Sequence, residues 1–193
     1  MPIIIRALTQ AEHPEAIRLA MDVFMQFEGP DYSQQGIDAF STALRDPAFL
    51  DALRIYGALD GDSLVGILAT RNSGSHIALF FVKEAYQKKG IGKQLFLLAA
   101  QESPSDKMTV HASPYALEVY RRLGFRDTAP EQLTDGIRYT PMECCIRNAA
   151  CPCKRIKCHR HGQCVLCRAY HAASRRKPFP SCERPEKKRR RER

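Results

Sequence analysis

The segment Tyr86–Ala100, YQKKGIGKQLFLLAA, places two glycines among lysines just before an apolar run. Ile91, Leu95 and Ala99 recur at helical spacing, which predicts that a helix begins at the glycines. The preceding run His76–Val82 has the composition of a strand. A helix start carries unpaired N–H groups and a partial positive charge, and glycine lets a ligand approach the backbone. This strand–turn–helix arrangement therefore predicts a phosphate site.

Spacing separates three phosphate-binding patterns. A Walker P-loop needs a glycine where Gln87 stands and a Ser or Thr where Gln94 stands, and the dinucleotide fingerprint needs a third glycine where Leu95 stands. Neither pattern fits. The remaining pattern, Q-x-x-G-x-G over residues 87–92, resembles the pyrophosphate-binding motif of the GCN5-related N-acetyltransferase (GNAT) superfamily, whose members bind acetyl-coenzyme A.

A second stretch, SPYALEVYRRLGF over residues 113–125, resembles a later helix of the same superfamily and the strand that follows it. The resemblance covers roughly residues 2–146. It implies a GNAT fold, which is an α/β (α+β) arrangement with a mixed sheet between helices. It also implies an acyltransferase that moves an acetyl group from acetyl-CoA to a primary amine, by direct attack of the amine on the thioester.

The resemblance also implies which residues hold the cosubstrate and act on it. The strand contacts to the pantetheine arm map to Phe80, Phe81 and Val82, and Tyr120 matches the tyrosine that protonates the departing thiolate. The predicted pyrophosphate turn consists of Gln87, Lys88, Lys89, Gly90, Ile91, Gly92 and Lys93.

The base that accepts the amine proton is left open. His111 stands where many relatives have asparagine, so it is a candidate either for contacting the arm or for acting as the base. Glu28 and His76 are further base candidates. Removing the proton of an alkylamine at pH 7 costs about 4.6 kcal/mol, whereas positioning contributes on the order of 7–11 kcal/mol, so one weak base suffices. The acceptor is not identified, although the loop over residues 25–36 is expected to help form its pocket.

Periodicity and turn residues predict the elements that must position this chemistry. The expected order is β-α-α-β-β-β-α-β-α-β-β. The predicted ranges are a strand at 2–8, helices ending near 27 and spanning 33–45, strands at 54–59, 63–71 and 76–82, the motif helix, a strand at 107–111, a helix at 114–122, and a hairpin of 123–127 with 137–146.

Charge and cysteine content divide the chain. Residues 1–146 carry a net charge of −4 and residues 147–193 a net charge of +13. We therefore expect a GNAT domain at 1–146, a cysteine-rich module at 147–182 and a basic disordered tail at 183–193. The apolar patch near the N-terminus is too short for a signal peptide and no run is long enough to span a bilayer, so a cytoplasmic protein without membrane contact is expected.

The cysteine-rich module resembles short modules at the ends of other bacterial proteins. In a cytoplasmic protein such a cluster is more typical of metal binding than of disulfides, and thiolates with imidazole favour zinc or an iron–sulfur centre. A structural zinc would make this a metal-stabilised appendage. An unstructured basic tail with reducible thiols is the alternative. The candidate ligands are Cys151, Cys153, Cys158, Cys164, Cys167, His171 and Cys182.

Two further hypotheses stand beside the enzyme. One is a non-catalytic acetyl-CoA-binding scaffold whose basic tail binds nucleic acid or an acidic partner, and the other is a redox-sensing enzyme whose tail thiols control activity. The expected partners are a small-molecule or protein amine and, through the tail, nonspecific nucleic acid. A homodimer is left open.

Overall fold

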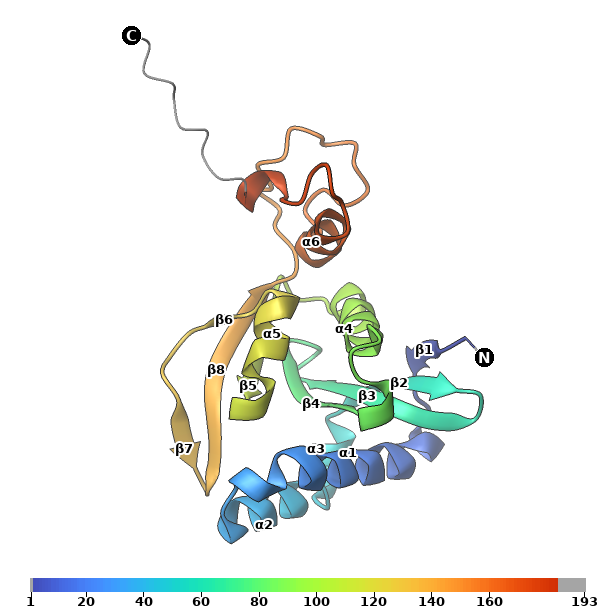
Figure 1. Cartoon of the computed structure of the whole chain (residues 1–193), viewed down its shortest axis with the longest axis vertical. Helices are drawn as coiled ribbons and strands as arrows, with labels where there is room; N and C mark the ends of the chain where they lie inside the picture. The colour runs from blue at the N-terminus through green and yellow to red at the C-terminus, as the bar shows by residue number, and fades with distance from the viewer. Residues whose placement is uncertain (1, 184–193) are drawn as a thin grey trace.

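A computed structural model describes residues 2–183 (Figure 1). The predicted basic tail, apart from residue 183, lies outside the described residues. The strands are β1 (Ile4–Ala7), β2 (Arg54–Asp60), β3 (Ser63–Arg71), β4 (His76–Val82), β5 (Lys107–Ala112), β6 (Arg126–Asp127), β7 (Gln132–Thr134) and β8 (Ile137–Cys145). The α-helices are α1 (His13–Phe27), α2 (Gln34–Ala43), α3 (Pro47–Asp51), α4 (Ile91–Glu102), α5 (Leu117–Leu123) and α6 (Cys164–Ala172).

The strands form one mixed sheet in the order β1-β2-β3-β4-β5-β8-β6, and β7 pairs with β8. Among the described strands, β4 and β5 pair in parallel, and the other neighbours are antiparallel. The sheet lies between α1–α3 on one side and α4–α5 on the other (Figure 1). This arrangement confirms the mixed α/β sheet expected from the sequence.

Each face of the sheet has its own apolar core. On the α1–α2 face, Leu19 and Phe24 of α1 pack with Ile67, Leu79 and Phe81 of the sheet. The core on the opposite face combines α4 and α5 with the sheet, and includes Leu95, Phe96, Met108, Tyr120 and Phe125. The two cores fix the sheet between its helices, so the strand ends that carry the site have little freedom to move.

A β-bulge in β4 opens the sheet. Ala69 of β3 pairs with Leu79, whereas the next residue of β3, Thr70, pairs with Ile77, so Ala78 is the extra residue on β4. Parallel pairing of β4 with β5 is limited to His76 with Thr109 and Ile77 with Val110. A bulge bends the strand that carries it and increases its twist. Beyond Ile77, therefore, β4 leaves β5 and a gap separates the two strands.

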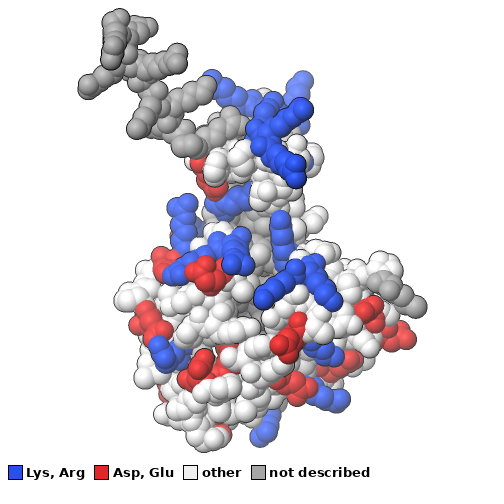
Figure 2. Space-filling view, in the orientation of Figure 1, with Lys and Arg blue, Asp and Glu red and all other residues white. Residues whose placement is uncertain are grey.

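The cysteine-rich region folds onto the domain. Residues 147–183, called the appendage below, contain α6, which packs against α4. Val165 of α6 is 6% exposed and joins the core of the α4–α5 face. Arg168 donates from Nη1 to the Cys145 carbonyl oxygen (3.1 Å) and from Nε to Glu183 (2.6 Å). Figure 2 shows lysine and arginine side chains over the appendage, whereas the body below carries both signs of charge.

Some elements differ from the predicted ones. The strands at 63–71 and 76–82 have the predicted bounds, but β1 is shorter than 2–8 and the helix predicted from 114 begins with a 3-10 turn, Pro114–Ala116. α3, β7 and α6 were not predicted. Each of these three is short, so their formation depends on packing against the rest of the fold. Within residues 2–183, no helix has the length and apolarity needed to cross a bilayer.

The tip of the β7–β8 hairpin touches α2 through two glycines. A Cβ added at Gly36 of α2 would lie 2.4 Å from the carbonyl oxygen of Gly136, in the hairpin turn. Nearby, the Tyr32 hydroxyl donates to the Arg138 carbonyl oxygen at 2.8 Å. The backbones of α2 and the hairpin therefore approach so closely at Gly36 and Gly136 that there is no room for a side chain between them.

We predict that Gly36→Ala destabilises the protein although alanine is the better helix former. The methyl group displaces the hairpin, at about 1–3 kcal/mol, which outweighs a gain of roughly 1 kcal/mol in helix propensity. Thermal unfolding should show a lower Tm for the variant. Gln35→Ala, at an exposed position of the same helix, is the control and should leave Tm unchanged. A G36A protein as stable as the wild type would contradict this account.

Candidate active site at the splayed strands

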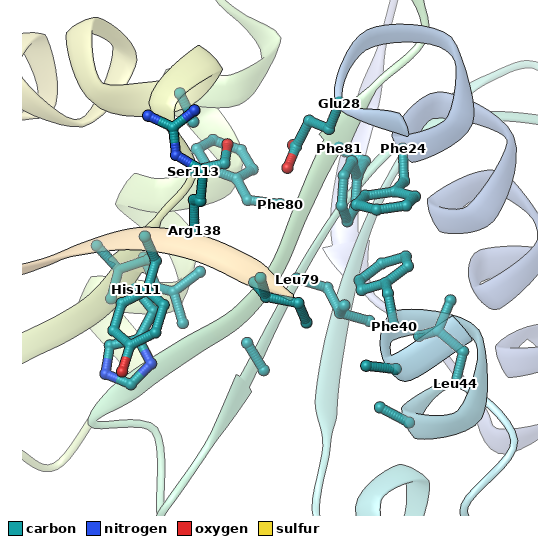
Figure 3. A pocket seen from close by; sticks show the side chains of 18 of the residues that line it. Phe24, Glu28, Phe40, Leu44, Leu79, Phe80, Phe81, His111, Ser113 and Arg138 are labelled. Carbon is teal, nitrogen blue, oxygen red and sulfur yellow. The ribbon is translucent and has the colours of Figure 1, made fainter. Parts of the chain in front are cut away.

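A cavity of about 510 Å³ lies where β4 separates from β5. Its walls come from α1 and α2, from β3–β5 and from the β7–β8 hairpin. In Figure 3, the Glu28 carboxyl points into the cavity from the end of α1, and the opposite wall carries His111 and Arg138. The apolar part of the lining consists mainly of Phe24, Phe40, Leu44, Phe49, Leu79, Phe80 and Phe81.

The glycine turn has the geometry that its sequence predicts. Gly90 has φ +81° and precedes the first residue of α4, a left-handed conformation that favours glycine. A Cβ added at Gly92 would lie 3.1 Å from Phe80 Cζ, so the first turn of α4 approaches β4 closely. Gln87 Nε2 donates to the Val82 carbonyl oxygen at 3.1 Å and ties the turn to the strand end.

Backbone N–H groups at the start of α4 have no acceptor within the helix and are available to an anion. Lys88, Lys89 and Lys93 are exposed around this turn, and Lys89 Nζ lies 5.2 Å from the centre of the Tyr86 ring. The predicted pyrophosphate residues thus form one continuous turn at a helix N-terminus.

Phe80, Phe81 and Val82 form the part of β4 beyond the bulge. Phe81 packs into the core under α1 and α2, whereas Phe80 faces α4 and α5. The Phe80 ring centre lies 5.9 Å from that of Tyr120. These residues connect the glycine turn with the cavity, so the structure brings together the two halves of the predicted cosubstrate site.

Tyr120 lines the cavity and is 5% exposed. Burial raises the pKa of its phenol, and the Glu28 carboxyl raises that pKa further. The hydroxyl is therefore protonated at neutral pH and able to donate a proton.

Glu28 is a buried carboxyl group whose pKa is shifted towards neutral pH. Burial raises the pKa of its carboxyl to about 7, and an interaction with the Ser113 hydroxyl offsets part of that rise. At neutral pH about half of the carboxyl groups are then ionised. A group whose pKa is close to the working pH combines the correct ionisation state with useful basicity.

The two histidines are weaker bases than Glu28. Burial, Arg71 and His111 lower the pKa of His76 to about 4, and its Nδ1 lies 2.9 Å from Thr109 Oγ1. Burial and Arg71 also lower the pKa of His111, whose ring stacks on Tyr139 at 4.2 Å. Both rings are neutral at pH 7 and line the cavity.

The sequence marked Glu28 only by its chemistry, Ser113 only as the first residue of the stretch 113–125, and Arg71 not at all. These residues come from separate segments, the end of α1, the end of β5 and the end of β3. No motif links them, so only the tertiary fold shows that they share one cavity.

The predicted metal ligands all lie in the appendage. Cys151, Cys153, Cys158, Cys167 and His171 line a second cavity there, and Cys182 lies with Cys164 and Cys167 in a smaller one. Among residues 2–183, however, no three His, Cys, Asp or Glu side chains are close enough together to hold a metal ion.

The Cys164 thiol also faces the domain. Its Sγ lies 3.7 Å from Cys145 Sγ, at the end of β8. Burial and the Cys145 thiol raise the pKa of Cys164 to about 12, so this thiol is protonated at neutral pH.

Comparison with known proteins agrees with the fold and the motif. A family model described as an acetyltransferase (GNAT) domain matches residues 28–146. The chain is 36% identical over 87 residues to the uncharacterized N-acetyltransferase YvbK of Bacillus subtilis (strain 168). That match covers 40% of this chain and 56% of YvbK, so the chain spans little more than half of the relative.

Two solved structures have a similar fold. A GCN5-related N-acetyltransferase from Rhodopseudomonas palustris has a TM-score of 0.64 and 19% identity, over 75% of this chain and 96% of that one. The PaiA N-acetyltransferase from Thermoplasma acidophilum, in complex with coenzyme A, has a TM-score of 0.60 and 20% identity, over 75% of this chain and 99% of that one. At 19% and 20% identity, this similarity establishes that the chain shares the fold of these two proteins.

The raised pKa of Glu28 predicts a pH-dependent gain in stability for Glu28→Gln. Between the ordinary pKa of 4.5 and the folded value of about 7, the folded protein holds a proton that the unfolded chain releases. Stability from this group therefore falls as pH rises through that window and stays low above it. E28Q has no ionisable group at this position and does not lose this stability. The Tm of E28Q minus that of the wild type should therefore be at least about 2 °C larger at pH 8 than at pH 5.

Glu15→Gln is the matched control, because Glu15 is an exposed carboxylate of the same helix. The account of Glu28 is wrong if E28Q and E15Q shift Tm by the same amount at both pH values.

Proposed function

Because the chain belongs to the GNAT acetyltransferase family, we propose that it transfers the acetyl group of acetyl-CoA to the primary amine of an acceptor. The observation that carries this proposal is that Glu28 and Tyr120 line one cavity, at the point where β4 splays from β5 beside the glycine turn. A base, an acid and a cosubstrate channel are then adjacent.

The cosubstrate binds along the splay. The pyrophosphate lies against the N-terminus of α4 at residues 87–93, where N–H groups and the helix dipole favour an anion. The pantetheine arm follows β4 over residues 80–82, where the bulge has freed the strand edge from β5. The thioester then reaches the cavity beside Tyr120.

The acceptor amine approaches from the side of α1 and α2. Glu28, when ionised, attracts the ammonium group and takes its proton, which generates the neutral nucleophile. The amine nitrogen attacks the thioester carbonyl carbon and becomes positively charged. The carbon–sulfur bond then breaks, the Tyr120 hydroxyl protonates the departing thiolate, and the second proton of the nitrogen returns to the Tyr120 phenolate, which restores the hydroxyl. The products are the N-acetylated acceptor and coenzyme A.

We assign the role of base to Glu28 in preference to His111. A base with a lowered pKa accepts a proton from an ammonium group less readily than one with a pKa near 7. His111 also stacks on Tyr139, on the opposite wall. His111 is therefore better suited to lining the acceptor side of the cavity than to acting as the base.

We further propose that the appendage binds a structural zinc ion. Burial and the neighbouring thiols of Cys182, Cys151, Cys153 and Cys158 raise the pKa of Cys167, so five thiols lie in one neighbourhood. Zinc binding would deprotonate such thiols and draw them together, and its binding energy would add to the stability of a segment with a small core.

Two substitutions test the transfer mechanism. Glu28→Gln and Tyr120→Phe should each lower kcat/KM for an accepted amine by roughly 10²–10⁴, while coenzyme A still binds. In the wild type, log kcat/KM should rise with pH and bend near pH 7, where Glu28 becomes ionised, and E28Q should lack this bend. Coenzyme A release on a panel of primary amines is the assay. Tight acetyl-CoA binding with no turnover on any amine would instead support the non-catalytic scaffold.

Metal analysis tests the zinc proposal. Full-length protein purified under reducing conditions should contain at least one zinc per chain by elemental mass spectrometry, and a chelator should lower its Tm. Cys167→Ser should reduce the zinc content, whereas Cys144→Ser, at a buried thiol outside the appendage, should not. Protein that takes up no zinc after reduction and incubation with the metal would rule the site out.

A further inference from the structure

Arg71 is a cation that the mechanism above does not use. It is the last residue of β3, is half-buried and lines the same cavity as Glu28 and Tyr120. Its Nε is buried and has no hydrogen-bond partner among residues 2–183. None of the ion pairs in this part of the chain includes Arg71. A half-buried guanidinium with an unsatisfied donor is costly to maintain unless a ligand satisfies it.

The surroundings of Arg71 do not neutralise it. His76 is its partner across the β3–β4 pair, and the His76 and His111 rings are 5.1 Å apart. Both histidines are neutral at pH 7, and Arg71 contributes to the low pKa of each. The carboxylates that line the cavity, Glu28 and Asp135, form no ion pair with Arg71. This part of the cavity therefore has a positive potential.

Between the charged groups the wall is apolar. It is formed by the aromatic rings of α1, α2 and β4, among which Phe24 and Phe40 stack at 4.0 Å and Phe40 meets Phe81 at 6.0 Å. A cavity of about 510 Å³ lies in the size range of sites for small molecules. The lining thus offers a carboxylate for an amine, a guanidinium for an anion and rings for an apolar body.

We propose that the acceptor is a small aminocarboxylate with an apolar body, and that Arg71 binds its carboxylate. A planar guanidinium can form two parallel hydrogen bonds to a carboxylate, which fixes the orientation of the bound molecule as well as holding it. The inference rests on the proposed acetyl transfer, because the amine end of the acceptor is assigned from Glu28. Arg71 is a specificity-determining residue in this account and takes no part in the chemical step.

Binding of a carboxylate that has no amine tests this site without requiring turnover. The probe is 3-phenylpropionate, and its uncharged counterpart is 3-phenylpropanol. Full-length protein saturated with coenzyme A should bind the carboxylate at least tenfold more tightly than the alcohol in isothermal titration calorimetry. Arg71→Gln should remove this preference, and Arg71→Lys should retain part of it. Arg126→Gln, at an exposed arginine of β6, should retain all of it.

Equal affinity for the two probes in the wild type overturns the inference. So does an unchanged preference in R71Q, provided that Tm and coenzyme A affinity show the variant to be folded. At least tenfold tighter binding of the matching phosphonate than of the carboxylate would also overturn the assignment, because it would indicate a phosphorylated acceptor.

A second assay separates this inference from the proposed function. Amines are compared in pairs that differ only by a carboxylate at the end remote from the amine, such as 4-(aminomethyl)benzoate with benzylamine and 6-aminohexanoate with pentylamine. The wild type should favour the carboxylate member of each pair by at least tenfold in kcat/KM, and R71Q should reduce that ratio towards one while still acetylating the simple amines. Acetylation of amines with no preference contradicts the Arg71 site alone. Absence of any acetylation together with Arg71-dependent carboxylate binding contradicts the transfer function alone.

Discussion

A single extra residue in β4 shapes the whole site. With Ala78 unmatched on β3, the register between the two strands shifts and β4 turns away from β5 after Ile77. Backbone groups that would otherwise bond to a neighbouring strand are left facing a gap. The same shift sets the directions of Phe80 and Phe81, one towards α4 and α5 and the other towards α1 and α2. A cosubstrate arm can lie in this gap because its amides can replace those of the missing strand.

Desolvation shifts the pKa values of the polar groups around the gap in different directions. Removal of water disfavours every charged form, so it raises the pKa of a carboxyl and a phenol but lowers that of an imidazole. In one apolar cavity, burial therefore raises the pKa of Glu28 to about 7, keeps the Tyr120 hydroxyl protonated and leaves the two histidines uncharged. In the proposed acetyl transfer, Glu28 meets the amine of the acceptor and Arg71 meets its carboxylate.

The appendage is distinct in composition but joined to the domain by packing. Its charge and cysteine content mark a change near Arg147, yet Val165 is buried in the domain core and Arg168 binds the Cys145 carbonyl oxygen. One buried valine and a few polar contacts give a small interface, and a bound metal would add the stability that such a segment lacks. The position of α6 against α4 places the appendage near the helix that begins at the glycine turn.

The glycine turn before α4 was determined by the sequence alone, because its geometry is local. Six residues specify where α4 begins, and the positive φ of Gly90 follows from a residue type that tolerates it. The strands and helices with strong periodicity were predictable for the same reason, whereas short elements such as α3, β7 and α6 form only through contacts with distant parts of the chain. Only the tertiary structure decided which of several acids and bases belong to the site. The pKa of Glu28 depends on side chains contributed by separate helices and strands, and so does the lack of an ion pair for Arg71 within residues 2–183. Burial is a property of how those segments pack.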